Sequence, residues 1–336
     1  MRTFKDKSKS VFTTKRLFFS SAVTENFTLS YINNSKLNLE PWWVSGFTDA
    51  EGCFTLSVVR NKELKVGWVV KFRFQISLHQ KDKALLEQIQ NYFCAGNVHK
   101  RGSQSLQFRV DSVKDLKVII NHFDKYPLIT QKLADYKLLK QAFMLILNKE
   151  HLTMEGLRKI VAIKASMNNG LSDELKAAFT NLPPVERPEA EAMAGILIRD
   201  PQWLAGFTSG ECCLMVTVRK SSTHRTGSQV ELVFQINQHS RDEQLMLSLA
   251  EYLKCGVISK HSKNAIVFKV TKFSDLNQNI IPFFSRYPII GVKSKDFSDF
   301  CKVADIMKEK GHLTTEGLNQ ICRIKAGMNT GRKFEA

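Results

Sequence analysis

The sequence predicts an α+β fold in which one unit is built twice within a single chain. The stretch WVSGFTDAEGCFTLSVV, from Trp43, returns as WLAGFTSGECCLMVTVR, from Trp203. Glu51 and Glu211 occupy matching places in the two stretches, 160 residues apart (211 − 51). Three further pairs of segments repeat at an offset of 160 or 161 residues: 72–93 with 232–253, 124–132 with 285–293, and 150–170 with 311–331. Order and spacing both persist, which indicates an internal duplication.

The duplication divides the chain into four parts. The first repeat covers 41–170 and the second covers 201–336, with a tail at 1–40 and a linker at 171–200. The linker contains three prolines, which interrupt helices and strands. The tail is rich in Lys, Arg, Ser and Thr, a composition shared by mitochondrial transit segments, basic tails and remnants of longer fused reading frames. Such a duplication predicts a monomer that acts as a pseudo-dimer with approximate two-fold symmetry.

Each half is expected to run in the order helix, two strands, helix, two strands, helices. Apolar and polar residues alternate in three segments of each half, which is the pattern of half-buried strands. The apolar residues expected to face the core are Phe54, Leu56, Val58, Phe72, Phe74, Ile76, Leu78, Leu106, Phe108 and Val110 in the first half, and Leu214, Val216, Val218, Leu232, Phe234, Ile236, Ile266, Phe268 and Val270 in the second. Each half therefore predicts a sheet with one buried face and one wet face.

The charge balance indicates the kind of partner. The chain has 49 Lys and Arg against 32 Asp and Glu, a formal net charge of +17. A basic excess of this size favours nucleic acid first and an anionic membrane second. No apolar run is long enough for a membrane span, so a membrane is not an expected partner. The seven cysteines form no C-x-x-C pair, which indicates neither a zinc cage nor a disulfide framework and favours a reducing compartment.

The wet faces of the predicted sheets carry Lys, Arg and Gln rather than residues of mixed charge. Gln and Arg form paired hydrogen bonds with base edges, and Lys and Arg neutralise phosphates, so these faces predict binding of DNA or RNA. Two long polar hairpin tips, 60–67 and 219–228, suit the flanks of a duplex. The predicted nucleic-acid contacts are Arg60, Lys62, Lys71, Arg73, Gln75, Lys100, Gln107, Arg109, Arg219, Lys220, Arg225, Gln235, Lys260 and Lys269.

The repeated helix carries small residues four positions apart, at Gly46 and Ala50 in the first copy and at the matching positions of the second. Residues at this spacing share one helix face, and small ones let two helix backbones approach closely. Packing the two helices against each other would bring Glu51 and Glu211 together at their ends. Two nearby carboxylates at electronegative helix ends repel each other. A divalent cation would relieve this repulsion, and Mg²⁺ prefers one or two carboxylates with water and phosphate oxygens.

The segments VSGFTDAEG (44–52) and LAGFTSGEC (204–212) resemble the two motifs of the LAGLIDADG homing endonucleases. The resemblance covers 41–331 and is to the single-chain, two-repeat members encoded by fungal organellar introns. It implies paired αββαββα halves whose motif helices form the interface and whose sheets straddle DNA. It also implies a site-specific endonuclease that cuts both strands of a duplex across the minor groove, and an organellar, mitochondrial location.

The resemblance assigns roles to residues that match the family motifs. The last acid of each motif, Glu51 or Glu211, would bind metal, and the residue before it, Ala50 or Gly210, would offer a backbone carbonyl. The metal would be Mg²⁺ or Mn²⁺, and Ca²⁺ would bind without supporting cleavage. The basic residue near the scissile phosphate would be Lys132 in the first half and Lys293 in the second. The polar residue that orders water would be Gln238. Leu78, which matches Gln238, cannot order water, so the halves are expected to be unequal.

The sequence departs from the family pattern at two positions, and it is compatible with two other functions. Ser209 stands where the family often has Asp, and Cys212 stands where it usually has Gly. The second half-site is therefore expected to be the one that is tuned or weakened. The family also includes RNA maturases, which bind their host intron RNA and assist its splicing. A basic ribosome-associated protein would explain the charge but not the paired glutamates.

Overall fold

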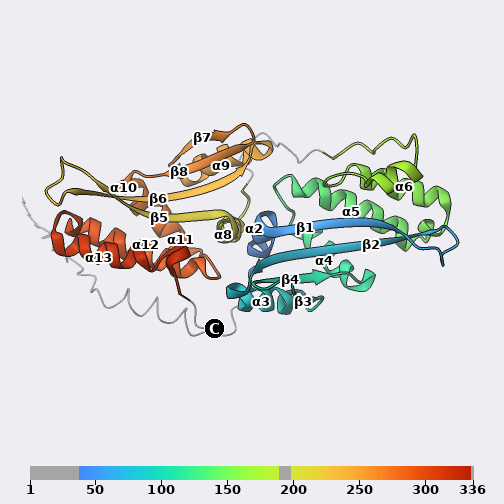
Figure 1. Ribbon diagram of the computed structural model, residues 1–336, viewed down its shortest axis with the longest axis horizontal. Coiled ribbons are helices and arrows are strands. Elements are labelled where there is room, and N and C mark those ends of the chain that lie inside the picture. Colours follow the sequence, from blue (N-terminus) through green and yellow to red (C-terminus); the bar gives the residue numbers. More distant parts are fainter. Residues whose placement is uncertain (1–37, 189–197, 334–336) are drawn as a thin grey trace, which may run out of the picture. The chain divides into compact units, whose positions relative to one another are not determined.

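The computed structural model describes residues 38–188 and 198–333, and each half forms one four-stranded antiparallel sheet (Figure 1). The strand orders are β1-β2-β4-β3 and β5-β6-β8-β7, so the two halves share one topology. The strands are β1 (Gly52–Arg60), β2 (Trp68–His79), β3 (Asn97–Lys100), β4 (Ser105–Val110), β5 (Cys212–Lys220), β6 (Ser228–His239), β7 (Val257–Ser262) and β8 (Ala265–Val270). The predicted duplicated α+β architecture is confirmed.

Helices precede, separate and follow the strands in both halves. In the first half they are α2 (Pro41–Glu51), α3 (Lys83–Phe93), α4 (Val113–Lys125), α5 (Lys132–Leu147), α6 (Met154–Ala165) and α7 (Asp173–Ala178). In the second they are α8 (Pro201–Glu211), α9 (Glu243–Leu253), α10 (Phe273–Asp275), α11 (Ile281–Arg286), α12 (Lys293–Lys308) and α13 (Thr315–Ala326). Across 38–188 and 198–333, none of the helices has the length and apolar character needed to cross a membrane.

The inner face of each sheet forms the core of its half. Phe54, Phe74 and Ile76, and their counterparts in β5 and β6, are all at most 2% exposed. Intermediate and exposed residues alternate with them along β1 and β2, which leaves the other face of the sheet open to solvent. Helices α3, α4, α5 and α6 contact the strands of the first sheet. The period-two pattern thus separates a helix-covered face from a wet face, as predicted.

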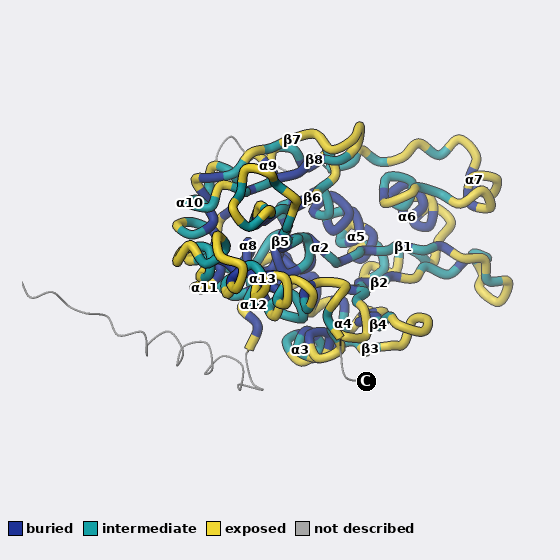
Figure 2. Tube along the Cα trace, turned by 60° about the vertical axis from the view of Figure 1, so that its left-hand side comes forward, coloured by how far each residue is buried: buried dark blue, intermediate teal, exposed yellow. Residues whose placement is uncertain are grey.

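Helices α2 and α8 pack against each other at the centre of the described structure (Figures 1 and 2). Each begins with a proline, whose missing N–H is not needed at a helix start. A Cβ atom at Gly46 would lie 2.9 Å from the backbone nitrogen of Phe207, and one at Gly206 would lie 2.8 Å from that of Phe47. No side chain fits at either place, so the predicted backbone-to-backbone packing of these helices is confirmed.

The first part of the predicted linker belongs structurally to the first half. Helix α7 begins after Ser172, whose hydroxyl caps it. Leu175 and Phe179 are 3% and 5% exposed in the first core, and the Phe179 ring lies 5.5 Å from that of Trp68. Residues 189–197 of the predicted linker, and nearly all of the predicted tail at 1–40, lie outside the described residues.

Candidate catalytic site at the paired helix ends

The two motif glutamates lie at the adjoining ends of α2 and α8. Glu51 is the last residue of α2 and Glu211 is the last residue of α8, because the next residue in each chain segment turns into an extended strand. Glu51 Oε1 lies 3.4 Å from the point that a Cβ at Gly210 would occupy. The small residues of the helix face therefore bring one glutamate against the end of the other motif helix.

Burial and mutual repulsion make this pair electrostatically costly. Removal from water raises the pKa of Glu51 and of Glu211, and the charge of Glu51 further raises the pKa of Glu211. Lys132 and Lys293 oppose these shifts at both glutamates. Gln238 Nε2 also donates to Glu211 Oε1 at 3.2 Å. The two carboxylates thus share one site in which positive charge is stabilising.

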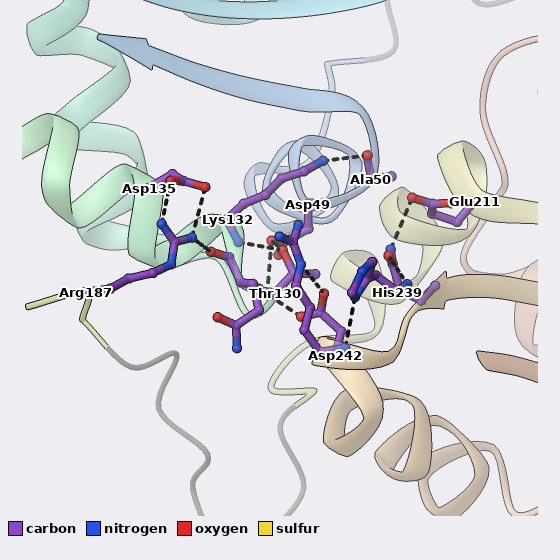
Figure 3. A network of polar contacts seen from close by, with 12 residues as sticks. Asp49, Ala50, Thr130, Lys132, Asp135, Arg187, Glu211, His239 and Asp242 are labelled. Atoms are coloured by element: carbon purple, nitrogen blue, oxygen red, sulfur yellow. Dashed lines mark hydrogen bonds and ion pairs between the residues drawn. The ribbon is translucent and has the colours of Figure 1, made fainter. Parts of the chain in front are cut away.

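The predicted lysines reach the same site, one from each half. Lys132 Nζ donates to the carbonyl of Ala50 at 2.6 Å (Figure 3). It also donates to the carbonyl of Thr48 at 3.3 Å. Lys293 Nζ donates to the carbonyl of Gly210. Burial lowers the pKa of Lys132, and the nearby charges of Asp49, Glu211 and Glu51 oppose that shift. Each predicted lysine is therefore in direct contact with a carbonyl oxygen that was predicted to bind metal.

The donor set at the helix ends fits a hard divalent cation. Within the described ranges, no group of three or more His, Cys, Asp or Glu side chains could hold a metal ion. Protein ligands would therefore be the two glutamates and the carbonyl oxygens before them, which are all oxygen donors of the kind that Mg²⁺ and Ca²⁺ prefer. The Lys132 ammonium already stands as a cation against the Ala50 oxygen. Water and phosphate oxygens would have to complete such a coordination shell.

The two halves differ sharply two residues before the glutamates, at Asp49 and Ser209. Asp49 is 1% exposed, and its carboxylate accepts hydrogen bonds from Ile129 N, Thr130 N, Thr130 Oγ1 and Trp203 Nε1 at 2.6–3.2 Å (Figure 3). Despite these donors, burial raises the pKa of Asp49 to about 6. Ser209, at the matching position, accepts only from Ile290 N, at 3.0 Å.

The serine leaves a donor without an acceptor. Trp43 Nε1 is buried and has no hydrogen-bond partner, whereas its counterpart Trp203 Nε1 donates to Asp49. A buried N–H without a partner costs about 1–3 kcal/mol. The two halves therefore differ in hydrogen bonding beside the motif glutamates, in line with the expected inequality.

By register, the predicted contacts on the open faces of the sheets are Lys71, Arg73, Gln75, Gln107, Arg109, Arg219, Gln235 and Lys269. The predicted contacts Arg60, Lys100, Lys220 and Lys260 instead have the register of core-facing residues, at strand ends, and Arg60 bonds to Glu174 of α7 at 3.2 Å. In the first sheet Gln75 pairs with both Cys53 and Arg109, and Arg109 pairs with Asn97, so one polar row crosses all four strands. Among the predicted contacts the exposed residues are Arg60, Lys62, Lys71, Lys100, Arg219, Lys220, Arg225 and Lys260, and the half-buried ones are Arg73, Gln75, Arg109, Gln235 and Lys269.

Gln107 differs from the other predicted contacts. It is 1% exposed, its amide Nε2 donates to Ser77 Oγ at 2.7 Å, and its Oε1 accepts from Arg109 Nε. Both ends of the amide are therefore engaged within the sheet. The sequence pattern placed Gln107 on the correct face, but neighbouring side chains cover it, so its structural role is to orient Arg109.

Sequence reasoning missed two acidic residues that join the halves. Asp82 Oδ1 accepts from Val292 N at 2.7 Å, and Asp242 Oδ1 accepts from Gln131 N at 2.8 Å. Their offset of 160 residues (242 − 82) equals that of the motif glutamates. Both acids lie inside the repeated segments 72–93 and 232–253, so the shared offset was the signal that could have found them.

The fold and site together define a single-chain pseudo-dimer with one acidic centre shared by two basic sheets. A family model described as LAGLIDADG endonuclease matches residues 44–143 and 204–304, which is more than half of the chain. The chain belongs to the LAGLIDADG endonuclease family. The resemblance seen in the two motifs is thereby confirmed.

Two fungal relatives are intron proteins by name. "Probable intron-encoded endonuclease 3" of Neurospora crassa is 44% identical over 291 residues, which are 86% of this chain and 54% of the relative. "Uncharacterized 50.9 kDa protein in ND4 intron 1" of Podospora anserina is 50% identical over 117 residues, which are 34% of this chain and 26% of the relative. The chain thus spans about half the length of the Neurospora relative. Neither relative is named as a maturase.

Solved structures of one homing endonuclease resemble this chain along nearly its whole length. The crystal structure of the I-SmaMI LAGLIDADG homing endonuclease bound to cleaved DNA superposes with a TM-score of 0.86 at 48% identity, covering 89% of this chain and 99% of that one. I-SmaMI bound to uncleaved DNA in the presence of calcium ions gives a TM-score of 0.85 at 47% identity, covering 88% and 100%. The duplicated fold is therefore that of this family.

Proposed function

We propose that this protein is a site-specific endonuclease that hydrolyses both strands of a DNA duplex with the help of a divalent cation. The observation that carries the proposal is the pair Glu51 and Glu211. Close packing of α2 and α8 holds these carboxylates together, and a lysine from each half contacts the adjoining carbonyls. Family membership and the DNA-bound state of I-SmaMI support the substrate class.

The residues of the site have separate tasks in this reaction. Glu51 and Glu211, with the carbonyls of Ala50 and Gly210, would hold the cation. When bound, the cation supplies a water of lowered pKa and neutralises charge on the phosphate. The lysines Lys132 and Lys293 stabilise the negative charge that develops on the scissile phosphates.

Gln238 has a task that only the second half can perform. Its amide already donates to Glu211, so it is placed to order a water beside that carboxylate. Leu78, at the matching end of β2, has no polar group. The water-ordering contact is therefore proposed for one half only.

The open faces of the sheets bind the duplex in this proposal. The polar row through Gln75 and Arg109 reads base edges, and the exposed Lys and Arg of the hairpins contact phosphates. The protein acts as a monomer, because its two halves already supply both half-sites. Mg²⁺ or Mn²⁺ supports cleavage and Ca²⁺ supports binding alone. The ND4 intron relative favours a mitochondrial origin.

The experiment begins with selection of a cleaved sequence from a plasmid library that carries random duplex inserts. With Mg²⁺ and that duplex, Glu51→Gln and Glu211→Gln should each lower the cleavage rate by about two orders of magnitude or more, while binding persists. Glu155→Gln is the matched control, because the Glu155 side chain is 84% exposed on the distant helix α6. Cleavage at the wild-type rate by both active-site variants would refute the proposal.

A further inference from the structure

Two aspartates cross from one half of the protein to the other. The Asp242 carboxylate, in the second half, accepts from Gln131 N at 2.8 Å in the first half (Figure 3). The Asp82 carboxylate, in the first half, accepts from Val292 N at 2.7 Å in the second. The two contacts are reciprocal, because each half supplies one acid and receives one.

Each aspartate is held at the end of a strand that belongs to the open sheet face. Strand β2 ends at His79, whose Nδ1 accepts from Lys81 N at 3.2 Å, and strand β6 ends at His239, whose Nδ1 accepts from Arg241 N at 3.2 Å. These bonds cap the short 3₁₀ turns Gln80–Asp82 and Ser240–Asp242. The acids are therefore fixed relative to the strands that precede them.

The residues that receive these bonds stand directly before the candidate catalytic lysines. Gln131 and Val292 are the N-cap residues of α5 and α12, and Lys132 and Lys293 are the first residues of those helices. The first N–H groups of a helix have no partner within it, and the positive end of its dipole favours a carboxylate. An aspartate from the opposite half thus fixes the start of each lysine-bearing helix.

The two loops depend on their aspartates to different extents. The loop before Lys132 has further anchors, because Thr130 bonds to Asp49 and Arg187 Nη2 donates to the Gln131 carbonyl at 3.2 Å. The loop before Lys293 has the bond to Asp82 and the single contact of Ile290 N with Ser209.

Gly291 shows how closely the second loop lies on its aspartate. The φ angle of Gly291 is +85°, and a Cβ there would lie 2.8 Å from Asp82 Oδ1. The backbone at this point rests on the carboxylate itself. Removing the carboxylate should therefore release the Lys293 loop more than removal of Asp242 releases the Lys132 loop.

We propose that Asp82 and Asp242 are positioning residues that act across the halves, with Asp82 setting Lys293 and Asp242 setting Lys132. The inference rests on the proposed role of these lysines in phosphodiester cleavage. In this arrangement neither lysine is held in place by its own half alone. Each half of the pseudo-dimer completes the active site of the other.

The test measures single-turnover cleavage at saturating enzyme, on the selected duplex with each strand labelled separately. Asp82→Ala should lower the rate by about 10- to 100-fold, as expected for misplacement of a charged group by about 1 Å. Asp242→Ala should have a smaller effect. Affinity for the same duplex with Ca²⁺ should change by less than about threefold, and Asp82→Asn should restore most of the rate. Asp173→Asn is the control, because that side chain is fully exposed.

A double-mutant cycle shows whether the aspartate acts through the lysine. In a Lys293→Met background, Asp82→Ala should cause little further loss. Full additivity of the two losses, or an unchanged rate for Asp82→Ala while Lys293→Met is impaired, would overturn the positioning role alone. An unchanged rate for Lys293→Met would instead overturn the proposed lysine function, and the positioning role with it.

Discussion

Replacement of Gly206 by alanine tests whether close packing of α2 and α8 supports both folding and catalysis. The new Cβ would meet the backbone of the partner helix: its nearest neighbour would be the carbonyl oxygen of Trp43, and Phe47 N and the carbonyl carbon of Trp43 would each lie 2.8 Å away. Comfortable contacts between such atoms are about 3.5 Å or longer, so the helices must separate by roughly 0.7 Å or more. Neither neighbour is a flexible side chain that could move aside.

The magnitude follows from two opposing effects. Overpacking against rigid surroundings typically costs about 1–3 kcal/mol and sometimes more, and contact with backbone places this site at the upper end. Alanine in place of glycine inside a helix returns about 1 kcal/mol of helix propensity. Taking the overpacking cost here as about 3–5 kcal/mol, because the contact is with rigid backbone, the net loss should be about 2–4 kcal/mol. At about 2 °C per kcal/mol for a large domain, Tm should fall by about 4–8 °C.

The assay is thermal unfolding of Gly206→Ala beside Gly327→Ala, followed by cleavage of the selected duplex below both transitions. Gly327 follows the last residue of α13 with φ −90°, and a Cβ there would only touch the carbonyl oxygen of Ile324 at 3.5 Å. The control should therefore match the wild-type protein in both measurements. Equal Tm values for the two variants would refute the packing argument, and full cleavage by Gly206→Ala would refute its link to the glutamates.

Three further predictions concern buried charge near the site. Asp49→Ala should destabilise the protein by about 3 kcal/mol or more, because it leaves several buried donors, including Trp203 Nε1, without an acceptor. Ser209→Ala leaves one donor without an acceptor and should cost about 1–2 kcal/mol. Equal losses of stability in thermal unfolding would contradict this difference. Burial raises the pKa of Asp49 from 3.8 to about 6, so the folded state binds a proton more tightly than the unfolded chain, and stability should fall as pH rises from about 4 to about 6 and then level off. The raised pKa corresponds to a loss of roughly 3 kcal/mol in the free energy of unfolding, of which more than about 1 kcal/mol should be lost between pH 5 and 8. The Tm difference between wild type and Asp49→Asn should therefore change over that pH range, and a constant difference would exclude the raised pKa. Finally, Glu211→Gln should raise Tm at pH 7 in the absence of divalent cation, because burial and the charge of Glu51 both raise the pKa of Glu211 and so disfavour its ionised form. A lower Tm would contradict this and would show that the lysines stabilise the ionised form more strongly.

The sequence predicted those features that depend on local patterns repeated at one offset. Alternation along β1 and β2 separated the core face from the wet face, and the small residues at Gly46 and Gly206 predicted the helix interface. These signals need only neighbouring residues and the known periods of strands and helices. The pairing of Glu51 and Glu211 was predicted from the same helix, because a glutamate ends it in both copies.

The sequence could not predict features that depend on what other segments cover. Gln107 has the correct period for an exposed strand residue, yet Ser77 and Arg109 bind its amide and it is buried. Helix α7 lies in a segment whose prolines indicate a linker, but its apolar residues complete the first core. The shared offset of Asp82 and Asp242 marks them as a repeated pair, but their contacts arise only when the halves are assembled, so no local period reveals what they bind.

The difference between Asp49 and Ser209 acquires its meaning from those crossing contacts. Asp49 binds the loop that precedes Lys132 within its own half, and Trp203 of the other half, so one buried carboxylate secures both the loop and the helix interface. Ser209 secures its own loop through one bond and leaves Trp43 Nε1 without a partner. The Lys293 loop is then held mainly from across the interface by Asp82. Weaker anchoring within the second half therefore makes that lysine the one more dependent on correct assembly of the two halves.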